Sequence, residues 1–386
     1  MNFGELGIAP TNYCNAKCLF CSSNAISNKN FEKHITVHDA IKLIEASLVL
    51  GCKKIIITGG GEPTTRIGDI LKIIKFAKSK NMKSSIVTNT SYATTTKEAM
   101  KLTLRLKQAG MDSFVLSFDQ EHLAYIPYKN YLNAIKAASK YGLNTMIQVV
   151  DRRLTKNKNT YYLKKLALDL HGKYKTTFFS KLSKIFGIFL HEKNWIFLKN
   201  KFIEIIRARV EYIGRAKSLK EFRFEKKENL VFDGTFCSKT IFSEKGLLFM
   251  NFDNNMTVGC CWPSLRDLSF KYDNKNFKRE LKNKEVVLKN ITSILGFLNL
   301  FLSIKNLELK NKRKFLKEKY YDKCNLCMDM MKVLSVEDLK NPSNIQVFFF
   351  VIFHVRYLII RCFQDIFIKI FSKNIFSTVA KKILMA

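Results

Sequence analysis

The chain has 386 residues, of which 47% are hydrophobic and 25% charged, and its formal net charge is +34. This composition excludes an intrinsically disordered protein, and the length allows a full enzyme core divided between two domains. The charge is mostly lysine and has two interpretations. Codon bias in an AT-rich genome produces it alone, whereas a functional origin would mean an anionic partner such as membrane lipid or a phosphate-bearing substrate.

The first 150 residues alternate short β-branched runs with amphipathic stretches. We expect buried strands at 4–10, 53–59, 84–89, 112–118 and 144–150, with helices at 38–51, 67–81 and 96–110. Two of these helices end in glycine, a common helix terminator. Continuous apolar strands separated by helices predict a parallel sheet covered by helices. With a sixth strand at 207–214, the predicted class is α/β, a partial (βα)6 TIM-like barrel with its active site at the carboxyl ends of the strands.

The later segments differ from this pattern. Residues 155–206 are expected to form a helical insertion, and 245–261 a hairpin that turns at 253–255. Residues 272–323 are charged and predicted helical, and their apolar part is too short to span a bilayer. The expected domains are therefore a core at 1–220, a small α+β domain at 221–340 and an amphipathic helical tail at 341–386.

The tail segment 345–373 combines a broad apolar face with a narrow polar stripe. Two interpretations stay open: a helix on the membrane surface, or a helix packed on the barrel or on a second subunit. Residues 1–10 lack the basic start and apolar core of a signal peptide, so we expect a cytoplasmic protein, with peripheral contact to the inner face of the membrane under the first interpretation. Grouped thiols in the cytoplasm usually bind metal.

Cys14, Cys18 and Cys21 lie within eight positions, directly after the first expected strand. A disulfide cannot use three cysteines, and a structural zinc needs a fourth ligand that no Cys or His before His34 supplies. Three thiolates can instead bind three irons of a four-iron four-sulfur (4Fe-4S) cluster and leave the fourth iron open. The spacing C-x3-C-x-aromatic-C, with Phe20 in the aromatic place, resembles the signature of the radical S-adenosylmethionine (SAM) superfamily.

Further matches to this superfamily follow at successive strand ends. Its GGEP element is present as Gly60, Gly61, Glu62 and Pro63, and the resemblance implies that it binds the SAM ammonium. "TNT" (88–90) stands where the family often has Thr-Asn-Gly, and "GRA" (214–216) resembles a stretch common at the end of the barrel. The resemblance implies that Ser117 and Asp119 meet the SAM ribose. Taken alone, the GGEP element could be a tight turn, and Ser117 or Asp119 could cap the next helix.

Arg152 follows the fifth expected strand. It could hold the SAM carboxylate or an anionic group of the substrate, or it could belong to a solvated loop. The mechanism that the resemblance implies is reductive cleavage of SAM to a 5′-deoxyadenosyl radical, which abstracts hydrogen from a substrate carbon. The electron would come from an external reductant of the flavodoxin or ferredoxin type.

A second group of cysteines lies beyond the barrel. By resemblance to the twitch module, a shortened relative of the SPASM domain, Cys237, Cys260, Cys324 and Cys327 would bind an auxiliary 4Fe-4S cluster. Cys261 is the alternative to Cys260, and zinc is the competing metal because C-x2-C pairs are also common zinc ligands. Cys52 and Cys362 are interpreted as packing thiols.

These features favour an oxidoreductase-type enzyme that oxidises or rearranges a small-molecule, sugar or lipid-linked substrate, with the auxiliary cluster as electron acceptor. The first alternative is a maturase of ribosomally made peptides, although we find no N-terminal peptide-binding domain before the first strand. The second is RNA modification. We do not expect nucleic-acid binding, because the basic residues are scattered among apolar ones rather than gathered with stacking aromatics.

Overall fold

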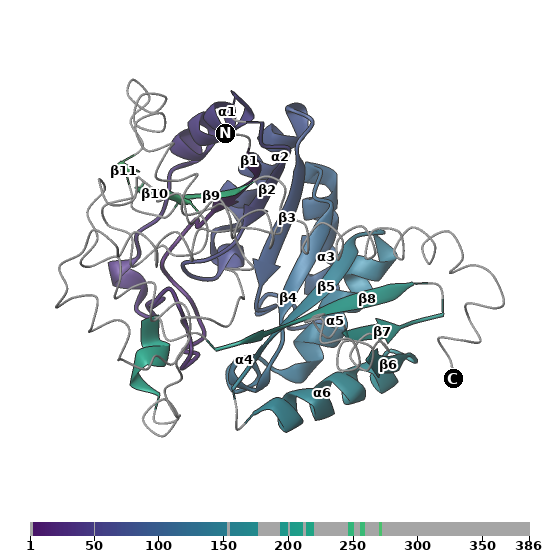
Figure 1. The fold of residues 1–386 in the computed structure, drawn as a ribbon. Helices are drawn as coiled ribbons and strands as arrows, with labels where there is room; N and C mark the ends of the chain where they lie inside the picture. The colour runs from purple at the N-terminus through teal and green to yellow at the C-terminus, as the bar shows by residue number, and fades with distance from the viewer. Residues whose placement is uncertain are drawn as a thin grey trace, which may run out of the picture.

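The computed structural model describes residues 3–49, 51–152, 155–176, 194–199, 201–210 and 214–219, and three short strands at 246–250, 255–258 and 270–271. These residues form a mixed α/β fold around one sheet (Figure 1). The strand order in the sheet is β11-β10-β9-β1-β2-β3-β4-β5-β8-β7-β6.

The centre of the sheet is parallel. It contains β1 (Phe3–Ile8), β2 (Lys54–Ile57), β3 (Lys83–Thr88), β4 (Ser113–Ser117), β5 (Asn144–Asp151) and β8 (Phe202–Arg209), each parallel to its neighbour. The five strands expected in the first 150 residues are therefore confirmed, as is the parallel sheet. That this sheet closes into a partial barrel stays a prediction.

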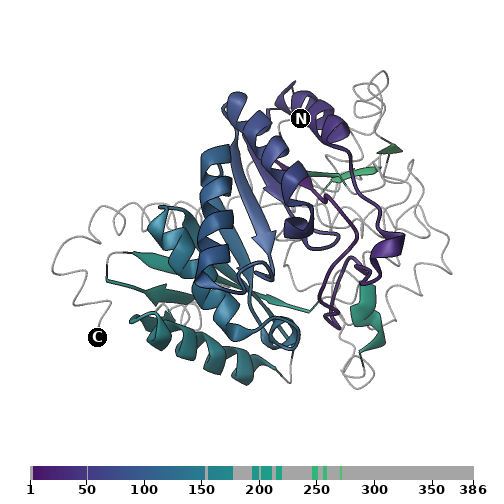
Figure 2. The ribbon, with the colours of Figure 1, turned by 180° about the vertical axis from the view of Figure 1, so that it is seen from behind.

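Helices connect the parallel strands. They are α1 (Val37–Val49), α2 (Ile67–Ser79), α3 (Thr96–Ala109), the short α4 (Gln120–Leu123), α5 (Tyr128–Lys140) and α6 (Lys156–Asp169). The view from behind shows α1, α2, α3 and α5 as a layer over one face of the sheet (Figure 2). Local chemistry sets the ends of α3: the Thr95 side chain accepts from Glu98 N, and Gly110 ends the helix in the left-handed region at φ +102°.

The core lies between this helical layer and the sheet. Ile55 and Ile57 of β2 are fully buried, as are Ile70 and Ile74 of α2. Burial of such a side chain stabilises the fold by about 1.5–3 kcal/mol. Because neighbouring strands from β1 to β8 pair in parallel, their carboxyl ends lie at one edge of the sheet.

Two expectations about residues 155–214 are wrong. The sixth parallel strand is β8 at Phe202–Arg209, not 207–214, and the expected helical insertion contains β6 (Lys173–Thr176) and β7 (Asn194–Phe197) after α6. These two strands add antiparallel to β8. The misleading pattern has a physical cause. Ile203 and Ile205 are buried while Phe202 and Ile206 are 49% and 43% exposed, so apolar side chains occupy both faces of the strand and mimic helical spacing.

The expected hairpin is present as β9 (Gly246–Met250) and β10 (Asn255–Val258), which pair antiparallel and are followed by β11 (Phe270–Lys271). β9 also pairs parallel with β1, so the hairpin extends the sheet on the β1 side. Of the expected turn at 253–255, Asn255 is the first residue of β10. Residues 253 and 254, the helical segment 272–323 and the tail 345–373 lie outside the described residues. In the part of the chain that is described, no helix is long and apolar enough to cross a membrane.

Candidate active site at the cysteine loop

The three-cysteine segment leaves the carboxyl end of β1 and is anchored at both ends. Isolated bridges join Thr11 to His34 and Tyr13 to Ile26. Within the loop, Cys14 N donates to Ile26 O at 2.8 Å and Cys21 N donates to the carbonyl of Cys18 at 3.2 Å. The backbone therefore folds back on itself and holds the three cysteines on one short loop.

Two of the three sulfurs accept a backbone hydrogen bond. Ala16 N donates to Cys14 Sγ at 3.4 Å, and Ala25 N donates to Cys21 Sγ at 3.5 Å. Hydrogen bonds to sulfur are one of the means by which a protein tunes an iron–sulfur cluster. All three cysteines are free thiols. Burial raises the pKa of the Cys14 thiol to about 12, and coordination to a metal would replace this proton.

The three thiols on one loop are a donor set that fits three irons of a 4Fe-4S cluster, because each cysteine binds a different iron. Among the residues that the structure describes, no three Cys, His, Asp or Glu side chains form a group that could hold a single metal ion.

The GGEP element packs directly against this loop. Gly61 N donates to Thr11 O at 2.5 Å, and Glu62 N donates to Tyr13 O at 2.7 Å. A Cβ on Gly61 would stand 1.7 Å from the carbonyl oxygen of Tyr13, so only glycine permits this approach. Gly60 N donates to Ser23 Oγ at 3.2 Å. The end of β2 thereby sets the position of the cysteine loop.

The Glu62 carboxylate is 3% exposed and has four protein donors. Oε1 accepts from Thr64 N, Thr64 Oγ1 and Thr88 Oγ1 at 3.1, 2.6 and 2.7 Å, and Oε2 accepts from Asn89 N at 2.8 Å. The carboxylate joins the ends of β2 and β3 to each other. Its expected contact with the SAM ammonium stays a prediction.

Asn89 is a site residue to which sequence reasoning gave no role. Its Nδ2 donates to Asn15 Oδ1 at 2.9 Å and approaches Cys14 Sγ at 3.8 Å, which links the end of β3 to the cysteine loop. The "TNT" match was the available signal. The next residue, Thr90, has φ +64°, in the left-handed region that favours glycine, and it stands where the resemblance gave a glycine.

Asp119 lies at the end of β4 and is 1% exposed. Its Oδ1 accepts from His122 N at 3.0 Å and lies 2.9 Å from His122 Nδ1, and its Oδ2 accepts from Val150 N at 3.3 Å. Asp119 therefore caps α4, which was the alternative interpretation. Ser117 is half-buried at the end of β4, and its carbonyl accepts from Tyr131 Oη at 3.0 Å. The ribose contacts of Ser117 and Asp119 stay predictions.

His122, which the sequence did not single out, lies between Asp119 and the cysteine loop. Its ring centroid is 5.7 Å from that of Phe20, the predicted SAM-binding aromatic. Burial opposes protonation of this imidazole, but the Asp119 carboxylate and the hydrogen bond to it raise the pKa of His122 well above the ordinary value. A histidine three positions after a strand-end aspartate was the only sequence signal.

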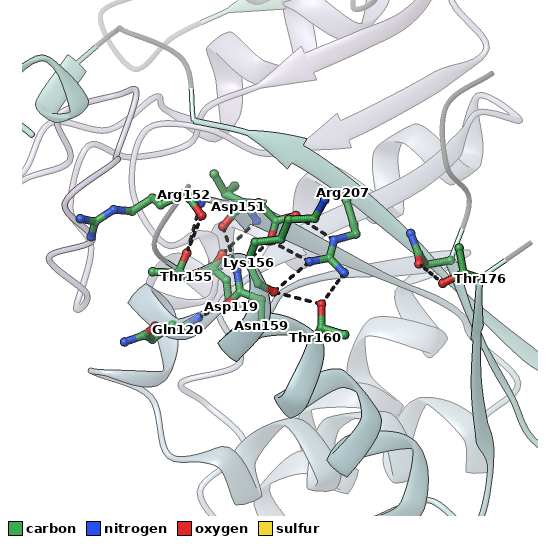
Figure 3. Close-up of polar contacts among 12 residues, drawn as sticks. Asp119, Gln120, Asp151, Arg152, Thr155, Lys156, Asn159, Thr160, Thr176 and Arg207 are labelled. Carbon is green, nitrogen blue, oxygen red and sulfur yellow. Dashed lines mark hydrogen bonds and ion pairs between the residues drawn. The ribbon is translucent and has the colours of Figure 1, made fainter. Parts of the chain in front are cut away.

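Arg152 follows β5 and pairs with Glu121 of α4. The neighbouring Asp151 forms a bidentate ion pair with Arg207 of β8, at 2.7 and 2.9 Å (Figure 3). In that view Arg152 extends away from the pair, on the other side of the strand end. Asn159 of α6 joins the group by donating to Asp151 Oδ1 at 3.0 Å. A role for Arg152 toward SAM or substrate stays a prediction.

The predicted auxiliary ligands Cys237, Cys260, Cys324 and Cys327, and the alternative Cys261, lie outside the described residues. The structure does describe the hairpin between the first two. Because β9 and β10 pair antiparallel, with Leu248 opposite Val258, the chain enters and leaves the hairpin at the same end.

Comparison with known proteins agrees with the cysteine loop. The radical SAM superfamily pattern matches residues 8–157. A probable GTP 3′,8-cyclase of Methanococcus maripaludis strain C6 is 32% identical over 146 residues, which are 38% of this chain and 45% of that protein. A GTP 3′,8-cyclase of Petrotoga mobilis is 28% identical over 149 residues, 36% of this chain and 44% of that protein. The match thus spans less than half the length of these curated relatives.

Among solved structures, the FeFe-hydrogenase maturase HydG aligns over 56% of this chain and 46% of its own, at 19% identity and a TM-score of 0.37. A TM-score this low supports no argument. Residues 8–157 match the radical SAM superfamily, and that family implies a 4Fe-4S cluster and SAM. This part of the chain, which includes the cysteine loop, is therefore similar to a radical SAM superfamily domain.

Proposed function

We propose that the protein is an enzyme that cleaves SAM reductively and removes hydrogen from a substrate carbon. One observation carries this proposal: three free cysteines stand on a single loop at the end of β1, two of their sulfurs accept backbone hydrogen bonds, and the GGEP element packs against the loop. When bound, a 4Fe-4S cluster supplies the electron for the cleavage, and the radical chemistry belongs to the cofactors rather than to side chains.

The residues of this chain hold and orient those groups. Cys14, Cys18 and Cys21 would ligate three irons, and Gly61 allows the backbone of β2 to reach the loop. Phe20, packed beside His122, offers an apolar surface for an adenine ring. Gly60, Ser117, Asp119 and Arg152 stand at neighbouring strand ends, where the remaining parts of SAM would bind.

We further propose that the reaction is a net oxidation or rearrangement of a small-molecule, sugar or lipid-linked substrate, with an auxiliary 4Fe-4S cluster on Cys237, Cys260 (or Cys261), Cys324 and Cys327. The β9–β10 hairpin supports this proposal, because its pairing returns the chain after β10 to the end from which β9 began. Cys237 precedes that hairpin and Cys260 follows it in the sequence.

The test is iron and sulfide content after anaerobic reconstitution. We expect about eight irons per chain, and about four in the Cys14→Ala/Cys18→Ala/Cys21→Ala variant, because each four-iron cluster requires its own cysteine ligands. The matched variant is Cys52→Ala, which removes a buried thiol of the core and should keep all eight. A triple variant that retains no iron would remove the auxiliary cluster from the proposal. A triple variant with native iron content would remove the SAM-binding cluster.

A phosphate-bearing substrate is the second candidate. Two observations favour it: the relatives are named GTP 3′,8-cyclases, and the net charge of +34 attracts anions. The shared 146 residues are 38% of this chain and less than half of those proteins, so the substrate does not transfer with the match. Under anaerobic turnover, SAM cleavage stimulated by a nucleoside triphosphate and not by neutral polyols would select this candidate over the first.

A further inference from the structure

The segment Gly214–Ser218 lies against the cysteine loop, although the two are separated by more than 190 positions in the sequence. Arg215 N donates to the carbonyl of Cys21 at 3.0 Å, and its side-chain Nη1 donates to the carbonyl of Ala25 at 2.9 Å. Ala25 is also the residue whose N–H donates to Cys21 Sγ. Arg215 therefore holds both ends of the turn that carries the third cysteine.

The approach is as close as the backbone allows. Gly214 has φ +57°, and a Cβ on it would stand 2.4 Å from the carbonyl oxygens of both Cys21 and Ser22. Behind it, Ala216 is fully buried in a small apolar cluster with Leu219, against which Phe20 packs. The contact is thus made by a glycine, an arginine and a buried alanine that pack closely against the loop.

Among the described residues, only one nitrogen of the Arg215 guanidinium, Nη1, donates a hydrogen bond. Nε and Nη2 are buried and have no hydrogen-bond partner among the residues that the structure describes. An unsatisfied buried donor costs about 1–3 kcal/mol, and more when the group is charged. Arg215 thus places two free donors and a positive charge beside the loop that carries the three thiols. Such an arrangement is expected around a bound anion.

We propose that Arg215 is a positioning residue of the cysteine loop, which fixes the Cys21–Ala25 turn and presents Nε and Nη2 to an anionic group bound on that loop. The anion is either the thiolate-ligated cluster itself or the carboxylate of SAM. This inference rests on the proposed cluster at Cys14, Cys18 and Cys21. It adds a residue from the far end of the domain to the site.

The experiment compares the full chain with Arg215→Gln and Arg215→Lys after anaerobic reconstitution. Arg105→Gln is the matched control, because it removes the same charge from an exposed position on α3. Three quantities are measured: iron content, the midpoint potential of the SAM-binding cluster by redox titration followed by electron paramagnetic resonance, and the Kd for SAM.

The two sources of the anion give different results. If Arg215 faces the cluster, Arg215→Gln shifts the midpoint potential to more negative values without SAM, since a nearby positive charge favours the reduced, more negative cluster. If it faces the SAM carboxylate, the potential is unchanged and the Kd for SAM rises roughly ten- to a hundredfold, the loss expected for a charge-assisted hydrogen bond. In either case Arg215→Lys shows a smaller change because it keeps the charge, and Arg105→Gln shows none.

The thermal stability of the iron-free chains separates positioning from a merely structural role. Arg215→Gln removes an uncompensated buried charge, so we expect its iron-free Tm to equal or exceed that of the unaltered chain. A variant with unchanged potential and unchanged Kd, or one whose only defect is a lowered iron-free Tm, overturns the inference. If the unaltered chain itself binds no iron at Cys14, Cys18 and Cys21, it is the proposed function that fails.

Discussion

Replacement of Gly61 by alanine should displace the cysteine loop. The added Cβ would lie 1.7, 2.3 and 2.7 Å from the O, C and N atoms of Tyr13, all of which are backbone atoms that cannot rotate away. Ordinary van der Waals contact requires about 3.5 Å between carbon atoms, so the loop or the end of β2 must move by about 1.5 Å. That movement breaks the two hydrogen bonds that Gly61 N and Glu62 N donate to Thr11 O and Tyr13 O.

The magnitude follows from those contacts. Each lost backbone hydrogen bond costs about 0.5–1.5 kcal/mol and the residual strain about 1–3 kcal/mol, so the free energy of unfolding should fall by about 2–6 kcal/mol. Gly68 is the matched control. A Cβ there meets nothing within 4 Å, and the residue is in α2, so Gly68→Ala should stabilise the chain by about 0.5–1 kcal/mol.

The assay is urea unfolding of both iron-free variants, followed by reconstitution and iron analysis. Gly61→Ala should unfold at lower urea and retain less iron, whereas Gly68→Ala should retain the native amount. A Gly61→Ala chain with native stability and native iron content would refute the argument that the end of β2 sets the position of the cysteine loop.

Three further changes test other parts of the site. Glu62→Gln should lower the free energy of unfolding by about 1–3 kcal/mol, because the glutamine NH2 group replaces one accepting oxygen and points at the groups that donated to that oxygen. An unchanged urea midpoint would contradict this. Asp151→Asn should cost about 2–4 kcal/mol by leaving the charge of Arg207 unpaired at 11% exposure, and adding Arg207→Met should recover part of the loss. If the double variant loses the sum of both single costs, the ion pair is not the cause. Burial raises the pKa of Cys52 to about 12 in the folded chain, so above about pH 9 the unfolded chain loses a proton that the folded chain keeps. The iron-free stability should therefore fall as the pH rises from 9 to 12, and Cys52→Ala should reduce that slope by up to about 1.4 kcal/mol per pH unit; an equal slope in the variant refutes it.

The parallel part of the fold could be predicted because local and long-range requirements agree there. The run at 53–59 is both β-branched and apolar, and β2 does bury Ile55 and Ile57. Strand β8 could not be predicted in the same way. It contains Glu204 and Arg207, and Arg207 is acceptable only because Asp151, 56 positions earlier, neutralises it across the neighbouring strand. No local pattern in the sequence contains that partner.

The site residues also divide into those that the sequence could predict and those that it could not. The cysteine spacing and the GGEP element predict where a cluster would bind, because those residue types are required by the ligand. The residues that hold the loop in place, Asn89, His122 and Arg215, are selected by geometry between distant segments. Their side chains are common polar ones, and their importance becomes visible only when the contacts with Asn15, Phe20 and Ala25 are known.

The pairing of β9 with β1 has a consequence for biosynthesis. The edge of β1 away from β2 is covered by residues that the ribosome adds about 240 positions later. At ordinary translation rates this edge stays open for on the order of 10–50 s, while the strand already carries an apolar sequence. An open strand edge is a site for pairing with other chains. Shortened chains that end soon after residue 219 should therefore aggregate in cells even if every helix of the core domain has formed, and expression should improve when the chain is extended past Val258.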